Sequence, residues 1–201
     1  GIIWKRELLR WWRDLFGEKA LAEARMRRMD VWDVILADLP EAPSGLLWLP
    51  YFAGSGTPYL DPHAKGAILG LTLDTTRKRL IKALLEGTCY ELDLNIRALR
   101  AAGVPIDRLR ATGGGSRSDT WLQLKADITG KPVVRLNVSE SGCQAGAILG
   151  GVALGVWKDV REATDALVAE GRAFEPRAEA HQRYEDLRET YAATWPAVRD
   201  V

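Results

Sequence analysis

One long stripe of apolar side chains constrains the fold of this chain more than any other feature. Between residues 76 and 102 these side chains recur at the spacing of a helix face, and they predict one helix that is buried against a sheet. Asp74 or Thr75 is expected to cap the start of this helix, and Gly103 is expected to end it. The stripe consists of Leu80, Ile81, Leu84, Leu85, Cys89, Leu92, Ile96 and Leu99.

Strand-like and helix-like segments alternate along the rest of the chain. Strands are expected at 45–52, 67–73, 108–112 and 132–136. Further helices are expected at 2–16, 19–38, 118–129, 143–156, 160–170 and 178–194. This alternation favours an α/β fold in layers, with helices flanking a sheet. We therefore expect one domain that has a helical leader at 1–42, a core at 43–158 and a helical tail at 159–201.

The composition argues against several classes of protein. The 201 residues carry 28 basic and 27 acidic side chains, so the net charge of +1 argues against a nucleic-acid or membrane partner. The longest apolar stretch, 145–157, is too short to span a bilayer. Cys89 and Cys143 lack the number and spacing of a disulfide scaffold or a zinc site, which fits a cytoplasmic protein.

Three consecutive glycines, Gly113, Gly114 and Gly115, separate an expected strand from an expected helix. A strand-to-helix turn exposes backbone N–H groups at the positive end of a helix dipole, which suits an anion. Glycine also allows a ligand or a packed neighbour to approach the backbone closely. The segment matches neither the G-x-G-x-x-G pattern nor the phosphate-binding loop that ends in Gly-Lys-Ser/Thr. The pattern alone leaves both a tight structural turn and an anion site open.

Three segments together point to a known family. They are "LPYFAGSGTPYLDPHAKGAILGLTLDTTRKRLIKALLEG", "LRATGGGSRSDTWLQLKADITGKPV" and a helix rich in glycine and alanine that ends in "ALGVWKD". In this order they closely resemble the C-terminal domain of the FGGY carbohydrate kinases, which include xylulokinase and glycerol kinase. The resemblance implies an actin-like (ribonuclease H-like) ATPase domain, with a mixed β-sheet flanked by helices. It also implies transfer of phosphate from ATP, with Mg2+, to a hydroxyl of a sugar or polyol in a cleft between two domains.

The resemblance also implies which residues touch ATP. The glycine turn, Gly113 to Gly115, would lie under the α-phosphate and ribose of ATP, with Gly114 and Gly115 on the phosphate side. Ser118 stands where a glycerol kinase places an asparagine near adenine. Arg10 stands where glycerol kinases have a glutamine that contacts ATP. In such kinases the catalytic aspartate, the magnesium carboxylates and most sugar contacts precede this region, so no catalytic or metal-binding residue is assigned here. The N-terminal domain of the kinase is the expected partner, and a homodimer is left open.

Other features are given structural interpretations. Glu86 and Glu91 on the long helix are expected to face solvent or to pair with Lys82 rather than to catalyse. Small residues at 141–155 predict a closely packed helix, and Cys143 is expected in a core. Two other functions stay open beside the kinase. One is an inactive actin-like domain used in assembly or regulation, and the other is a different ATPase of the same fold.

Overall fold

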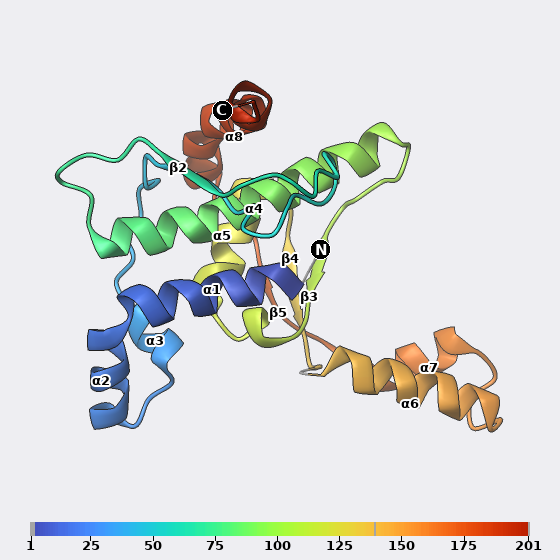
Figure 1. The fold of residues 1–201 in the computed structure, drawn as a ribbon. Helices are drawn as coiled ribbons and strands as arrows, with labels where there is room; N and C mark the ends of the chain where they lie inside the picture. The colour runs from blue at the N-terminus through green and yellow to red at the C-terminus, as the bar shows by residue number, and fades with distance from the viewer. Residues whose placement is uncertain (1–2, 139, 201) are drawn as a thin grey trace.

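The computed structural model of this protein describes residues 3–138 and 140–200 (Figure 1). Its helices are α1 (Ile3–Phe16), α2 (Glu18–Arg27), α3 (Val31–Leu36), α4 (Arg77–Ala101), α5 (Asp119–Thr129), α6 (Ser141–Ala153), α7 (Val160–Leu167) and α8 (Ala178–Val198). Its strands are β1 (Leu47–Leu49), β2 (Ala67–Leu69), β3 (Leu109–Ala111), β4 (Val133–Leu136) and β5 (Glu170–Phe174). A short 3-10 helix, η1 (Gly114–Ser116), joins β3 to α5. Ile2, where the sequence predicts the first helix to begin, lies outside the described residues.

Except for Leu99, which is 47% exposed, the apolar stripe found in the sequence lies on the face of α4 that packs against α1, α5, α8 and β1. Leu84, in the middle of the stripe, is fully buried. The predicted long helix is therefore confirmed. Its predicted cap at Asp74 or Thr75 is wrong, because the side chain of Thr76 accepts the hydrogen bond from the backbone N–H of Arg79.

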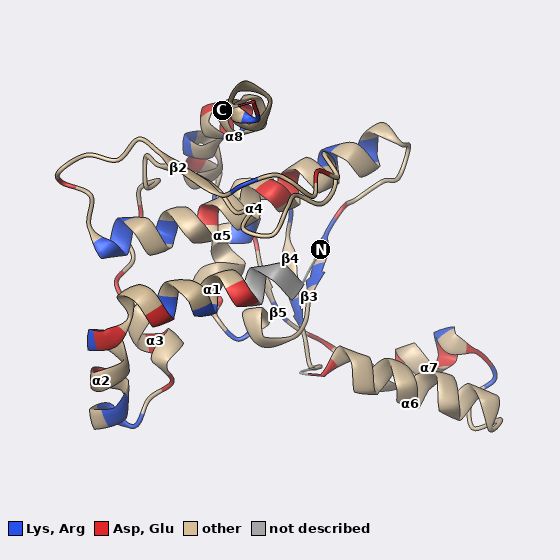
Figure 2. Cartoon of the chain, viewed as in Figure 1, with Lys and Arg blue, Asp and Glu red and all other residues tan. Residues whose placement is uncertain are grey.

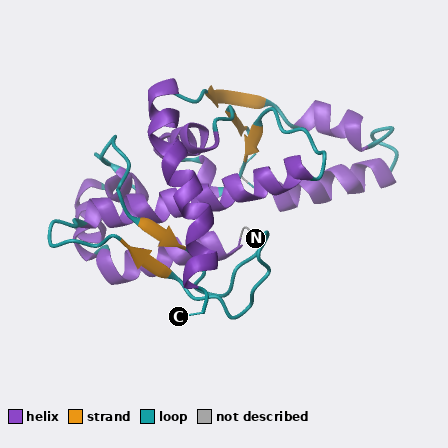
Figure 3. Ribbon diagram, turned by 90° about the horizontal axis from the view of Figure 1, so that it is seen from above, coloured by secondary structure: helices purple, strands orange, loops and turns teal. Residues whose placement is uncertain are grey.

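The strands form two separate sheets on opposite sides of a group of helices (Figure 3). Strands β1 and β2 form an antiparallel pair, in which Trp48 lies opposite Ile68. In the second sheet β4 lies between β3, to which it is parallel, and β5, to which it is antiparallel. This sheet is mixed, as predicted. Strand β1 is shorter than the predicted 45–52, since Pro50 lacks the backbone N–H that would continue the pairing.

Strand β5 lies in the tail 159–201, which the sequence predicts to be helical. Helix α7 ends at Leu167 rather than at residue 170, and the chain then pairs with β4. Of this strand's side chains only Phe174 is buried, where it packs against α5 and β4. With one buried side chain, β5 has no alternation of apolar and polar residues by which its sequence could be recognised as a strand.

The single helix predicted at 19–38 is broken into α2 and α3. Arg28 has a φ of 53°, in the left-handed region, and this conformation ends α2. The side chain of Asp30 then accepts a hydrogen bond from the backbone N–H of Trp32 at 2.8 Å and begins α3. Aspartate is a strong N-cap, and this local signal outweighs the apolar spacing that joins the two helices in the sequence.

Helix α8 is held against α4 by buried polar contacts. The Tyr184 hydroxyl donates to Glu86 at 2.8 Å, and the Tyr191 hydroxyl donates to Glu91 at 2.9 Å. Glu86 and Glu91 are 1% and 7% exposed, so the expectation that they face solvent is wrong. The expected ion pair is present for Glu86, whose carboxylate lies 3.7 Å from the ammonium nitrogen of Lys82.

Helices α6 and α7 pack on one another and project from the rest of the chain as an arm between β4 and β5 (Figures 1 and 3). Helix α6 carries no charged residue (Figure 2). Leu149 is 60% exposed, Leu154 is 83% exposed, and Cys143 is exposed as well. The predicted core position of Cys143 is therefore wrong, whereas the predicted close packing of α6 is present at Gly151, where a Cβ would lie 2.1 Å from the Trp157 ring. None of the described helices is long and apolar enough to cross a membrane.

Candidate functional site

The glycine turn between β3 and α5 is built from local hydrogen bonds. Gly113 has a φ of 80°, and its carbonyl accepts the backbone N–H of Ser116 at 3.0 Å and the Ser116 hydroxyl at 2.7 Å. Just before the turn, the Thr112 hydroxyl donates to the carbonyl of Val138 at 2.7 Å. These bonds set the path of the backbone through the turn.

The three glycines of the turn differ in their surroundings. Gly113 is in the left-handed region, which side chains rarely adopt. A Cβ on Gly115 would come within 2.9 Å of the Trp121 ring, so packing explains that glycine. Gly114 is exposed, its φ lies outside the left-handed region, and a Cβ there would meet no described atom within 4 Å. Neither the backbone conformation nor packing within the described residues requires glycine at Gly114, so the space in front of it is open.

Ser118 stands at the start of α5. Its side-chain oxygen accepts a hydrogen bond from the backbone N–H of Trp121 at 3.2 Å, so it is the N-cap of the helix. A hydroxyl has one donor and two acceptor sites, so this cap leaves it able to bind a ligand as well. The backbone N–H groups of the first turn have no intrahelical partner, and they point out of the same end of the helix.

Arg10 lies on α1, apart in sequence from the glycine turn. Its guanidinium is 3.4 Å from the carboxylate of Glu7, one turn earlier on the same helix, and both side chains are largely exposed. Gly113, Gly114, Gly115 and Ser118 therefore form one continuous segment, whereas no described hydrogen bond or ion pair joins Arg10 to it. A contact between Arg10 and a nucleotide stays a prediction.

Two arginines that the sequence interpretation did not single out hold this turn from the sheet. The Nε of Arg135, on β4, donates to the carbonyl of Ser116 at 2.7 Å. The same guanidinium also binds the carboxylate of Asp119, whose second oxygen is bound by Arg172 of β5. The one feature of the sequence that could have indicated this role is that Arg135 interrupts an otherwise apolar strand, "PVVRL".

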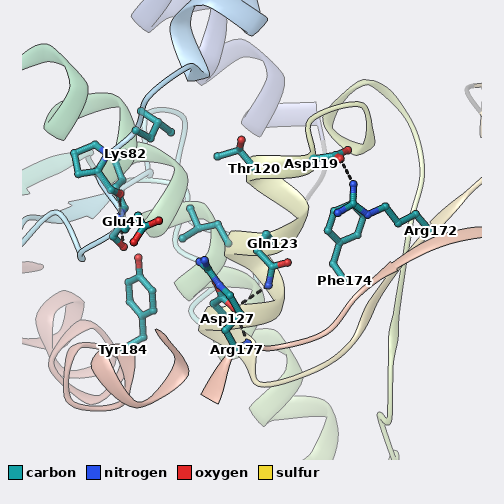
Figure 4. Close-up of a pocket in the computed structure, with 13 residues that line it drawn as sticks. Glu41, Lys82, Asp119, Thr120, Gln123, Asp127, Arg172, Phe174, Arg177 and Tyr184 are labelled. Atoms are coloured by element: carbon teal, nitrogen blue, oxygen red, sulfur yellow. Dashed lines mark hydrogen bonds and ion pairs between the residues drawn. The ribbon is translucent and has the colours of Figure 1, made fainter. Parts of the chain in front are cut away.

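A cavity of about 320 Å³ lies beside the first turn of α5, where Asp119 and Thr120 line it (Figure 4). Its other walls come from residues 39–41, α4, β5 and α8. Most of the charged groups in these walls have partners within the chain, and the exposed carboxylate of Glu41 is the exception among the described contacts. Arg177, for example, binds the buried carboxylate of Asp127 through two nitrogens, at 2.7 and 3.1 Å. The cavity thus reaches the first turn of α5 but is lined by none of the residues 113–118.

The buried charges behind this cavity serve the structure. The ammonium of Lys82 donates to the carbonyl of Glu41 at 3.0 Å and to the carbonyls of the two flanking residues. Burial lowers the pKa of Lys82, although the nearby carboxylate of Glu86 opposes this shift. Burial raises the pKa of Glu86, while hydrogen bonds from Ser44 and the charge of Lys82 oppose it. Burial and the Glu86 carboxylate raise the pKa of Tyr184, so its hydroxyl remains a donor.

A family model described as the FGGY family of carbohydrate kinases, C-terminal domain, matches residues 1–154. The chain belongs to this family. Xylulose kinase of Bacillus subtilis is 30% identical over 163 residues, which are 81% of this chain and 33% of that protein. Glycerol kinase 1 of Clostridium tetani is 38% identical over 148 residues, which are 73% of this chain and 30% of that protein. This FGGY chain therefore spans about a third of the length of these relatives.

Solved structures of sugar kinases share the fold of this FGGY chain. Xylulose kinase from Rhodospirillum rubrum superposes with a TM-score of 0.78 at 29% identity, covering 96% of this chain and 38% of its own. Gluconate kinase from Lactobacillus acidophilus gives a TM-score of 0.70 at 26% identity, covering 82% of this chain and 33% of its own. The predicted actin-like fold is thereby confirmed. Membership of the FGGY family also removes the alternative of a different ATPase of the same fold.

Proposed function

We propose that this FGGY domain is the nucleotide-side half of an ATP-dependent carbohydrate kinase, which transfers the γ-phosphate of ATP to a hydroxyl of a sugar or polyol. The observation that carries the proposal is the open space in front of Gly114, in the 3-10 helix η1 that precedes α5. Backbone N–H groups and the helix dipole favour an anion at such a place. The relatives, which include xylulose and glycerol kinases, support a sugar or polyol as the acceptor.

Each predicted residue has a role in this proposal. The backbone of Gly113, Gly114 and Gly115 would meet the phosphates and the ribose, because no side chain separates it from the ligand. Ser118 would use its remaining hydrogen-bonding sites on the adenine side. Arg10 would exchange its exposed pairing with Glu7 for a phosphate. In phosphoryl transfer the protein contributes mainly position and charge stabilisation, and these groups suit that task.

The remaining parts of the reaction are assigned to the rest of the kinase. Within residues 3–138 and 140–200, no three His, Cys, Asp or Glu side chains gather as a metal site would need. The described residues do not fit a magnesium site, so Mg2+ would arrive with the nucleotide and take its carboxylates from the N-terminal domain. That domain would also supply the catalytic base and the sugar contacts, in the cytoplasm. The exposed apolar face of α6, with Leu149 and Leu154, offers a surface on which it would dock.

Calorimetric titration of the 201-residue chain with Mg-ADP tests the nucleotide site. We expect measurable binding, together with no sugar-dependent release of ADP in a coupled assay of the chain alone, because both reactants must be held in one closed cleft. Absence of nucleotide binding would refute the proposed site. Sugar-dependent turnover by the chain alone would show that the catalytic base lies in this half. A full-length protein that binds Mg-ADP but phosphorylates no pentulose, polyol or glycerol would favour an inactive domain.

A further inference from the structure

The guanidinium of Arg135 joins the two parts of the glycine turn. Its Nε donates to the carbonyl of Ser116, the last residue of η1, at 2.7 Å. Its Nη2 binds the carboxylate of Asp119, the first residue of α5, and lies 3.5 Å from the carbonyl oxygen of Arg117. Because a guanidinium is a planar fork with fixed donor directions, these contacts fix the 3-10 turn relative to the helix that follows it.

A second arginine reaches the same carboxylate from the C-terminal tail. Arg172 lies on β5, beyond the residues 1–154 that match the FGGY model, and binds the other oxygen of Asp119. Its guanidinium carbon is 4.7 Å from the centroid of the Phe174 ring, and that of Arg135 is 5.5 Å from the same ring. Phe174 is buried, so both cations rest on one fixed aromatic surface. Figure 4 shows Asp119, Arg172 and Phe174 together at one edge of the cavity.

The charge of this cluster also suits an anion. Two guanidinium groups surround one carboxylate, so the cluster keeps an excess positive charge beside the start of α5. The positive end of the α5 dipole adds to this positive charge. The Asp119 carboxylate, bound on both oxygens, connects the sheet to the turn, while the open space in front of Gly114 remains free of side chains.

We infer that Arg135 and Arg172 are positioning residues, which act through Asp119 and the carbonyl of Ser116 to hold the glycine turn in the shape that receives a nucleotide phosphate. The inference rests on the proposed nucleotide site. It makes nucleotide affinity depend on β5, a strand outside the matched domain. If the two arginines served only the stability of the fold, their loss would lower the free energy of unfolding. If they position the turn, their loss changes the turn and its affinity for nucleotide while the fold stays intact.

Two variants and one matched control test this inference in the 201-residue chain. Arg135→Lys keeps the charge but replaces the fork by a point donor, and Arg172→Gln removes a cation whose side chain is 66% exposed. The control is Arg110→Gln, which breaks the exposed pair between β3 and Glu170 of β5, at 2.8 Å, away from the turn. The measurements are Mg-ADP affinity by calorimetry and amide hydrogen exchange at residues 113–117 without nucleotide.

We expect Arg135→Lys and Arg172→Gln to weaken Mg-ADP binding by about tenfold, the scale of one lost charged hydrogen bond, and to speed exchange at residues 113–117. Arg110→Gln should leave both quantities at their wild-type values. Wild-type affinity and exchange in folded Arg135→Lys and Arg172→Gln would overturn the inference. If the wild-type chain binds no Mg-ADP, the proposed function fails. Faster exchange in the two variants would then support only the part of the inference by which the two arginines hold the shape of the turn, and unchanged exchange would overturn that part as well.

Discussion

Substitution of Gly114 should affect the stability of the fold and the affinity for nucleotide differently. A Cβ at this position meets no described atom within 4 Å, and its φ is not in the left-handed region. Gly114→Ala should therefore leave the free energy of unfolding unchanged or raise it by about 0.4–1 kcal/mol, because alanine restricts the unfolded chain. The larger side chain of Gly114→Val also points into open space, so this variant should fold as well.

Although Gly114→Val should keep its stability, its affinity for nucleotide should fall. A valine side chain at Gly114 would fill the space in which we propose that phosphate meets the backbone. Each lost charge-assisted hydrogen bond costs about 1.5–3 kcal/mol, which corresponds to a loss of affinity of about ten- to a hundredfold. Calorimetric titration with Mg-ADP measures this loss, and urea denaturation of the same samples confirms that the variant is folded.

Two other glycines serve as controls for this experiment. Gly113→Ala should lower the free energy of unfolding by about 1–2 kcal/mol, since its φ of 80° is unfavourable for a side chain. Gly146→Ala, in an equally open position within α6, should raise stability by about 0.5–1 kcal/mol and leave Mg-ADP affinity unchanged. The reasoning is refuted if folded Gly114→Val binds Mg-ADP as tightly as the wild-type chain. A loss of more than about 1 kcal/mol in Gly114→Ala would refute the described geometry of the turn.

Three further predictions concern stability. Leu84→Ala should lower the free energy of unfolding by about 2–5 kcal/mol through lost burial and a cavity, and a urea-measured change below about 0.5 kcal/mol would contradict the burial of α4. Burial raises the pKa of the Glu86 carboxyl above 4.5, although Ser44, Lys82 and Tyr184 oppose the shift. The folded state therefore holds the proton of this carboxyl more tightly than the unfolded state does. The wild-type chain should therefore lose stability relative to Glu86→Gln as the pH rises from about 4.5 to 7, and the opposite slope would mean that attraction to its partners outweighs burial. Leu149→Lys should change the free energy of unfolding by less than about 0.5 kcal/mol and raise solubility, whereas a large loss would show that Leu149 is packed in solution.

The parts of the fold that could be predicted have signals within a short stretch of sequence. Helix α4 follows from one continuous stripe, and helix α5 lies where the sequence predicts a helix at 118–129, with Ser118 as its N-cap. The glycines and Ser118 are contiguous, so their closeness in space needed no knowledge of the fold. The N-cap at Asp30, which separates α2 from α3, is also a signal within a short stretch of sequence. The apolar spacing on both sides of it nevertheless predicts one continuous helix.

The parts that were missed depend on partners far along the chain. Glu86 is buried because Tyr184, 98 residues later, donates to it, and nothing near Glu86 in the sequence indicates this. Strand β5 exists through pairing with β4 rather than through its own apolar pattern. Arg135 and Arg172 reach the turn only when the sheet brings them there, so the cluster around Asp119 could not be read from residue spacing.

The α6–α7 arm forms the connection between β4 and β5. These strands are antiparallel neighbours with Leu136 opposite Glu170, and Asn137 exchanges two hydrogen bonds with Ala169, at 3.1 and 2.9 Å, to close the base of the arm. Topologically the segment is a hairpin whose loop, residues 137–169, contains two helices. Closing a loop costs about 0.6 kcal/mol less for each halving of its length, so a four-residue turn would relieve the sheet of about 2 kcal/mol. The pairing of β4 with β5 therefore does not require the α6–α7 arm, and the length of the arm costs the sheet this free energy.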